Sequence, residues 1–138
     1  MLPNLPFHLQ LIGYSMILLA LVHFTFPRRF NWKGELVSLG LLNRQVFKVH
    51  TFFIAFTVFC MGLLCVTSYD LLMTTELGRR VAIGLMVFWG IRLFAQFFIY
   101  SSELWRGKKF ETFMHVVFGL TWLYYTLAFA EIVFSLGS

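Results

Sequence analysis

Four apolar segments, each long enough to cross a lipid bilayer, limit the folds open to this chain more than any other feature. About 20 apolar residues in a helix span a hydrocarbon core of roughly 30 Å. The segments that pass this test are residues 7–26, 46–68, 81–100 and 113–134. They lack the polar–apolar alternation of barrel strands, and backbone amides in lipid must be paired within the segment, so helices are expected. The predicted fold is all-α: one four-transmembrane-helix bundle over residues 1–138.

The composition agrees with an integral membrane protein. The chain is 59% hydrophobic, 20% aromatic and only 12% charged, whereas soluble domains average about 25% charged residues. A soluble core of this size would not hide all 18 phenylalanines. Lipid accepts apolar side chains on the outside of a bundle, so the lipid bilayer is the first partner that the sequence predicts.

The basic residues predict an orientation. The formal charge is +5, but the basic residues flank the apolar segments, so we expect no nucleic-acid partner. Arg79 and Arg80 lie in the second link, whereas the first and third links contain Arg28, Arg29, Lys33, Arg44, Lys48, Arg106, Lys108 and Lys109. The positive-inside rule places these two links in the cytoplasm and both termini on the periplasmic side. Residues 34–42 are expected to form a short segment on the membrane surface.

Arg92 lies inside the third apolar segment, about 12 Å from Tyr100 along a helix. A charge at such a depth costs about 2.5–3.5 kcal/mol on insertion scales, so chains seldom keep one without a use. We therefore expect an acidic partner, a cofactor or a neighbouring subunit next to Arg92. Within the chain, Glu111 is the best placed acid, because Asp70 and Glu131 belong to the opposite side of the membrane.

Three histidines fall at a similar predicted depth. His23, His50 and His115 each lie about one turn from the cytoplasmic end of a predicted helix. Polar stripes should turn toward the bundle interior, because lipid cannot satisfy them. The three predicted stripes are Asn43, His50 and Thr57; Arg92 and Gln96; and Glu111, His115, Trp122 and Thr126.

Such a layer has several chemical interpretations. The predicted cofactor-binding residues are His50, His115, Arg92, Gln96 and Glu111. His50 and His115 would be the axial ligands of a b-type haem, whose propionates would favour a nearby cation. Alternatively, His50, His115 and His23 would bind a metal ion, or the layer would hold a quinone or a lipid headgroup. Against all three, a single histidine near a helix end often lies in the water interface.

Motifs for hydrolysis or nucleotide chemistry are missing. The sequence has no Cys-x-x-Cys-His, His-Glu-x-x-His, Walker or Gly-x-Ser-x-Gly pattern. Whether the protein is an enzyme therefore stays open.

A weak internal repeat is present. His23 precedes Trp32-Lys33-Gly34 by the same spacing as Gln96 precedes Trp105-Arg106-Gly107. A duplicated helical hairpin would produce this pattern. The tendency of Trp and basic residues to recur at membrane interfaces would produce it too, and we favour this second explanation.

Three stretches carry a resemblance to a known group of proteins. They are Leu42-Asn43-Arg44-Gln45 through Val49-His50-Thr51-Phe52-Phe53, Phe88-Trp89 to Arg92, and Leu104-Trp105-Arg106-Gly107-Lys108. In these the chain resembles small four-helix bacterial membrane proteins that carry no assigned activity. The resemblance implies a bacterial inner membrane and indicates nothing about catalytic residues.

These observations favour a small non-catalytic accessory or anchor subunit with a buried His/Arg layer near the cytoplasmic face. Its partner would be another membrane subunit or a second copy of the chain. The alternative is a haem- or metal-binding electron-transfer protein of the membrane.

Overall fold

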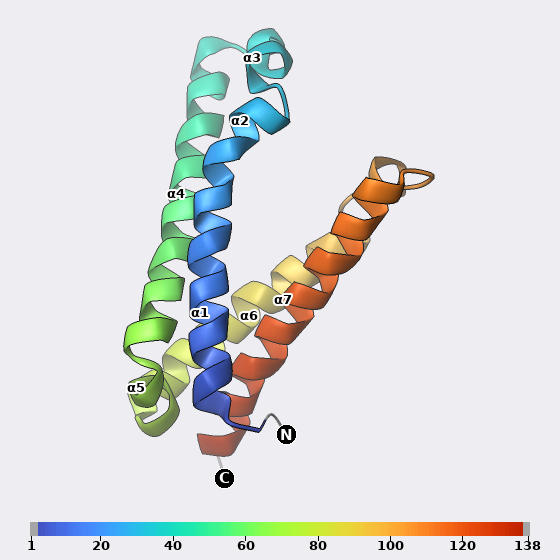
Figure 1. Cartoon of the computed structure of the whole chain (residues 1–138). Helices are drawn as coiled ribbons and strands as arrows, with labels where there is room; N and C mark the ends of the chain where they lie inside the picture. Colours follow the sequence, from blue (N-terminus) through green and yellow to red (C-terminus); the bar gives the residue numbers. More distant parts are fainter. Residues whose placement is uncertain (1–2, 137–138) are drawn as a thin grey trace. The chain divides into compact units, whose positions relative to one another are not determined.

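The computed structural model describes residues 3–136, and within this range the chain is helical and contains no strand. Four of its helices are long and apolar enough to cross a membrane (Figure 1). They are α1 (Leu5–Val22), α4 (Leu41–Thr67), α6 (Glu76–Phe98) and α7 (Lys109–Leu136), and the span that starts with α1 continues to Arg29. The predictions of an all-α chain and of four long apolar helices are confirmed.

The first apolar segment was expected to end at residue 26, but the first span continues through Pro27 to Arg29. α1 passes into a 3₁₀ turn, His23–Thr25, and then into the short helix α2 (Phe26–Arg29). Pro27 lies in the first turn of α2. Proline is tolerated there because the amide that it lacks would have no partner within the helix.

The other long helices extend beyond the apolar segments. α4, α6 and α7 begin four or five residues before the predicted 46, 81 and 113, because polar and basic residues in their first turns continue the helix. α6 has a clear start signal, since the Thr75 hydroxyl accepts a hydrogen bond from the Gly78 amide at 2.9 Å. An apolar segment therefore marks the part of a helix that suits lipid, not the ends of the helix.

Short helical pieces make up the links. The first link contains α3 (Trp32–Glu35) and a 3₁₀ turn, Leu36–Ser38, which occupy part of the surface segment predicted over residues 34–42. Asn31 precedes α3 in the left-handed conformation, with φ 52°. The second link contains α5 (Tyr69–Thr74), and the third a 3₁₀ turn, Ser102–Leu104.

The chain divides into two compact units. The α1–α4 unit is Leu9–Tyr69, and the α6–α7 unit is Asp70–Ser138 together with Met1–His8. Each unit contains a pair of long helices joined by a link that is rich in basic residues. The single four-helix domain over residues 1–138 stays a prediction.

Glycines bring α1 and α4 close together in the α1–α4 unit. A Cβ placed on Gly62 would lie 2.7 Å from the backbone oxygen of Gly13 and 2.8 Å from Cγ1 of Ile17. A Cβ on Gly13 would lie 2.8 Å from the oxygen of Gly62. Small residues allow membrane helices to approach in this way, so no larger side chain fits at either position without moving a backbone.

Aromatic rings fill the space between α6 and α7 in the other unit. Trp89 of α6 stacks on Trp122 of α7, with ring centroids 5.1 Å apart, and meets Tyr125 edge-on at 4.9 Å. Farther along, Nε of Arg79 donates to the backbone oxygen of Val133 at 3.2 Å. This helix pair is held by large rings and by side-chain hydrogen bonds, and no glycine of α6 or α7 meets the backbone of the other helix as Gly13 and Gly62 meet each other.

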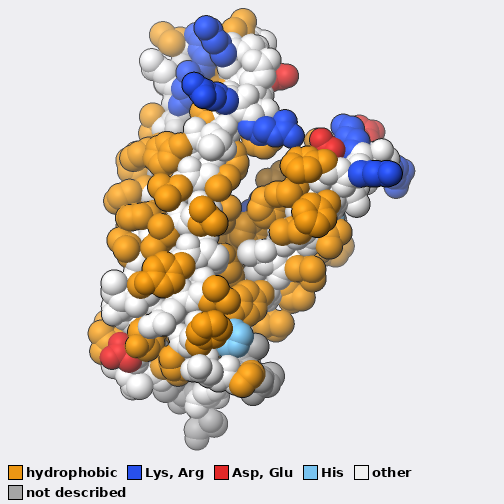
Figure 2. Space-filling view, in the orientation of Figure 1, with side chains coloured by type: hydrophobic (Ala, Val, Ile, Leu, Met, Phe, Trp, Pro, Cys, Tyr) orange, Lys and Arg blue, Asp and Glu red, His pale blue; other side chains and the backbone are white. Residues whose placement is uncertain are grey.

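Apolar side chains also cover much of the visible surface of both units (Figure 2). Phe24, Phe53 and Phe98 keep 66%, 57% and 73% of their surface exposed. Burial of one such side chain is worth about 1.5–3 kcal/mol in water, so the exposure of many would be costly for a soluble protein. Lipid removes this cost.

Candidate functional site

A polar cluster lies between α6 and α7. Arg92 and Gln96 project from α6, and His115 and Trp122 from α7. Gln96 is only 6% exposed and Trp122 only 3%, while Arg92 and His115 are half-buried. The structure thus brings together three of the predicted site residues, Arg92, Gln96 and His115.

Gln96 connects the cluster. Its Oε1 accepts hydrogen bonds from Nε1 of Trp122 at 3.2 Å and from Nη1 of Arg92 at 3.4 Å. Its Nε2 lies 2.8 Å from Nδ1 of His115. Trp122 and Arg92 have donors only, so the Gln96 oxygen must face them and the Gln96 amide nitrogen must donate to His115. Nδ1 of His115 is therefore an acceptor, and the neutral imidazole carries its proton on Nε2.

Two aromatic faces surround the guanidinium of Arg92. Its Cζ lies 5.1 Å from the ring centroid of Trp122 and 5.4 Å from that of Tyr100. A desolvated cation–π contact contributes about 2 kcal/mol, and a charge in the membrane costs about 2.5–3.5 kcal/mol. Two such contacts are together comparable to the insertion cost, but they leave the positive charge unneutralised.

Glu111 does not pair with Arg92, so the prediction of this ion pair is wrong. Glu111 lies in the first turn of α7 with its side chain exposed. Among residues 3–136, Arg92 has no ion pair, and its polar contact is the amide oxygen of Gln96. The helical stripe placed Glu111 on the face of His115 correctly, but one helical turn separates the two residues along the axis. A role for Glu111 in binding a cofactor stays a prediction.

The other predicted histidines belong to the α1–α4 unit. His50 is exposed, and its Nδ1 bonds the Val46 carbonyl of its own helix at 2.8 Å. His23 does the same with Leu19, also at 2.8 Å. Within the described part of the chain, no three His, Cys, Asp or Glu side chains form a group that could hold a metal ion. It stays a prediction that one haem or metal ion is bound jointly by His50, His23 and His115.

The predicted stripe on α4 does not lie on the face that packs against α1. Asn43, His50 and Thr57 are all exposed. The buried residues of α4 are instead Ala55, Val58, Gly62 and Cys65. Thr57 donates to the Phe53 carbonyl at 2.7 Å, so its hydroxyl is satisfied within the helix and has no need of a partner on α1.

Two aromatic contacts of the cluster were not predicted. Trp105 stacks on the imidazole of His115, with centroids 3.8 Å apart and planes at 12°. Tyr100 contacts Arg92 from beyond the end of α6. Both residues follow the last turn of α6, where helical periodicity no longer relates sequence to position. The sequence signal for Trp105 was only its place at a predicted membrane interface.

The cluster is poorly arranged to ligate iron through His115. An axial imidazole binds with an unprotonated nitrogen while its other nitrogen donates a hydrogen bond. In His115, Nδ1 accepts from Gln96 and the proton lies on Nε2. Ligation through Nε2 would require the Gln96 amide to turn over, which would direct its NH₂ group toward the donors of Trp122 and Arg92.

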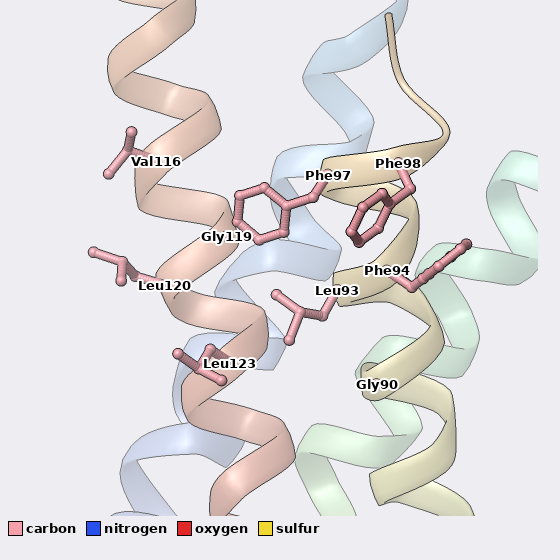
Figure 3. A pocket seen from close by; sticks show the side chains of 9 residues that line it. All are labelled: Gly90, Leu93, Phe94, Phe97, Phe98, Val116, Gly119, Leu120 and Leu123. Atoms are coloured by element: carbon pink, nitrogen blue, oxygen red, sulfur yellow. The ribbon is translucent and has the colours of Figure 1, made fainter. Parts of the chain in front are cut away.

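A separate apolar groove lies between α6 and α7. It has a volume of about 470 Å³, and Figure 3 shows its lining, which includes Phe94, Phe97 and Phe98 from α6 and Leu120 from α7. The Phe97 ring covers Gly119, where an added Cβ would lie 2.7 Å from Cζ of Phe97. Arg92, Gln96 and His115 are not part of its lining. The groove therefore suits lipid chains or an apolar helix and is distinct from the polar cluster.

Comparison of the chain with family models, with curated proteins and with solved structures finds no match.

Proposed function

We propose that this chain is a non-catalytic accessory or anchor subunit of a bacterial inner membrane, and that Arg92 contacts an acidic group of a partner protein. The charge of Arg92 carries the proposal. It lies within a helix that suits a membrane span, and among residues 3–136 no carboxylate neutralises it.

Insertion of the four helices is the first part of this proposal. The exposed phenylalanines and the length of the four apolar helices support it. In each unit the link between the long helices is basic, which favours a cytoplasmic position for both links. Arg79 and Arg80, at the other end of α6, both lie near Glu76, at 3.7 and 3.5 Å, so their charge is partly compensated.

The geometry of the cluster favours an acidic partner over an idle charge. Gln96 and the two rings hold the guanidinium at a fixed place. They offset the cost of inserting the charge but do not neutralise it, so a carboxylate supplied in the membrane would gain a charge-assisted hydrogen bond. The partner is another membrane subunit or a second copy of the chain.

Co-purification from native membranes tests the partner. We expect Arg92→Leu to lose the partner while the protein still inserts. Gln96→Glu should also lower the recovery of the partner, because a carboxylate at position 96 would neutralise Arg92 within the chain. Arg80→Leu is the matched control, since Arg80 is exposed and lies near Glu76, and it should retain the partner.

A charge exchange makes this test specific. Once a partner is identified, Arg92→Glu combined with an Arg in place of the partner's acidic residue should restore the complex. Partner recovery that is unchanged in both Arg92→Leu and Gln96→Glu would refute the role of Arg92.

Reporter fusions test the orientation. Alkaline phosphatase, which is active only outside the cytoplasm, should be inactive when fused after Gly34 or Gly107 and active when fused after Thr75. Activity after Gly34 or Gly107 would contradict the orientation.

A further inference from the structure

We propose that a pocket at the basic end of the α1–α4 unit binds the phosphate headgroup of an anionic phospholipid, and that an acyl chain of this lipid follows a groove between α1 and α4. The pocket has a volume of about 520 Å³ and lies where α1 turns into α2 and α3. Its polar lining is His23, Arg28, Trp32, Lys33, Lys48 and Thr51.

The charge of the pocket selects an anion. Arg28, Lys33 and Lys48 line it, and no Asp or Glu does. Within residues 3–136 none of these three cations forms an ion pair. Figure 2 shows the blue basic side chains gathered at this end of the unit. Basic pockets on the cytoplasmic side of membrane helices are typical sites for anionic headgroups.

The pocket is also amphipathic. Most of its inner wall is apolar, and it shares Phe24, Phe52 and Ala55 with a second cavity of about 220 Å³. The second cavity has only apolar lining, which also includes Ala20, Leu21, Phe56 and Phe59. From Lys48 to Phe59 the distance along α4 is about 16 Å, which is close to half of a hydrocarbon core of roughly 30 Å. The two cavities together match a headgroup and the acyl chain of one leaflet.

This combination favours a phospholipid over free phosphate. A small phosphate would use the cations but leave the apolar groove empty, whereas a lipid uses both. Lys and Arg stems at the rim can extend their charges to the headgroups, and Trp32 lies at the same level, as interfacial tryptophans do. The inference depends on the proposed insertion of the helices but not on the proposed partner of Arg92.

Native mass spectrometry of the purified full-length protein tests the inference. The added probes are dioleoyl phosphatidylglycerol, dioleoyl phosphatidylcholine, dihexanoyl phosphatidylglycerol and inorganic phosphate. We expect the long-chain phosphatidylglycerol to bind at least about tenfold more tightly than phosphatidylcholine, because each basic residue near a surface adds to the attraction for an anionic lipid. Binding of phosphatidylglycerol and phosphatidylcholine with equal affinity would overturn the proposal. Equal binding of inorganic phosphate and the long-chain lipid would also overturn it, because the pocket would then be a free-anion site.

Two sets of variants locate the site. Arg28→Gln/Lys33→Gln/Lys48→Gln should abolish the preference for phosphatidylglycerol. The matched control, Arg106→Gln/Lys108→Gln/Lys109→Gln, removes the same charge from the other basic link and should retain the preference. Leu21 is 53% exposed, so Leu21→Trp should fill the groove without unfolding the protein. It should weaken the binding of the long-chain phosphatidylglycerol and leave the binding of the dihexanoyl form unchanged. An equal loss in both triple variants would mean that net charge, not this pocket, determines binding.

Whether the chain is found in the membrane fraction distinguishes a failure of the proposed insertion from a failure of the lipid pocket. A chain that is absent from the membrane fraction would contradict insertion itself. An inserted chain without lipid preference would contradict only the pocket, and loss of the Arg92 partner would leave the pocket unaffected.

Discussion

The two helix pairs of this protein solve the same packing problem in opposite ways. α1 and α4 meet through Gly13 and Gly62, and the polar side chains His23 and His50 bond to carbonyls of their own helices. α6 and α7 are held apart by rings, and Gln96 bonds across to α7. The first pair thus places its charges at its end, where lipid headgroups would lie. The second keeps a charge inside.

The glycine contact is the part of this contrast that a mutation should break most severely. Gly62→Leu would push a side chain into the oxygen of Gly13 and the side chain of Ile17. Overpacking costs about 1–3 kcal/mol and occasionally more, and a contact with backbone cannot be relieved by a rotamer change. We expect a loss of about 3 kcal/mol of unfolding free energy, measured by denaturant titration in bicelles.

Gly84→Leu is the control for that experiment. Gly84 lies in α6 with nothing within 4 Å of an added Cβ, so a leucine there should leave the unfolding free energy unchanged or slightly higher. Equal losses in the two variants would mean that glycine flexibility, not close approach, explains the effect.

The polar bridge of the α6–α7 pair should give an intermediate effect. Gln96→Leu removes the partner of Trp122, of Arg92 and of His115 at once. Buried groups left without partners cost about 1–3 kcal/mol each when fully desolvated. We expect a loss of about 2 kcal/mol of unfolding free energy in the same titration. Gln45→Leu, at an exposed position of α4, should leave the unfolding free energy unchanged. If Gln96→Leu also left it unchanged, the bridge through Gln96 would be refuted.

The two link tryptophans should give the smallest effects, and different ones. Trp105→Ala removes the stack on His115, which is worth about 0.5–1.5 kcal/mol. Trp32 instead meets Phe47 edge-on at 4.8 Å and lines the basic pocket. We expect Trp105→Ala to lower the unfolding free energy without changing lipid preference, and Trp32→Ala to weaken phosphatidylglycerol binding. The same outcome for both variants would contradict distinct roles for the two links.

The long helices could be predicted from the sequence because a span of lipid requires a long apolar segment. The ends of the helices could not, because polar and basic residues such as Asn43, Arg44 and Lys109 near the starts of α4 and α7 resemble link sequence. Likewise, the apolar segment 7–26 stops just before Pro27, but the position of Pro27 in the first turn of α2 depends on the 3₁₀ turn before it. Local apolarity reports solvent preference, whereas helix ends depend on backbone hydrogen bonds.

Part of the polar cluster could be predicted from helical spacing alone. Arg92 and Gln96 are four residues apart on one face, and His115 and Trp122 share a face of α7. The pairing of Glu111 with Arg92 was predicted wrongly, because it was chosen by charge alone. In the structure the guanidinium of Arg92 lies against the rings of Tyr100 and Trp122. The Asn43, His50 and Thr57 stripe does not lie on the face of α4 that packs against α1, since a threonine or histidine in a helix can bond to its own backbone.

The surroundings of the Arg92 guanidinium in a lipid bilayer test the central claim most directly. Solid-state NMR with ¹⁵N-labelled arginine and ¹³C-labelled side-chain carbonyls would measure the dipolar couplings of this group, with Arg92→Lys used to assign its signal. The account predicts a coupling to the Gln96 amide carbon and none to a carboxylate of the isolated chain. A coupling between Arg92 and the carboxylate of Glu111 would contradict it, because the charge would then be neutralised without a partner.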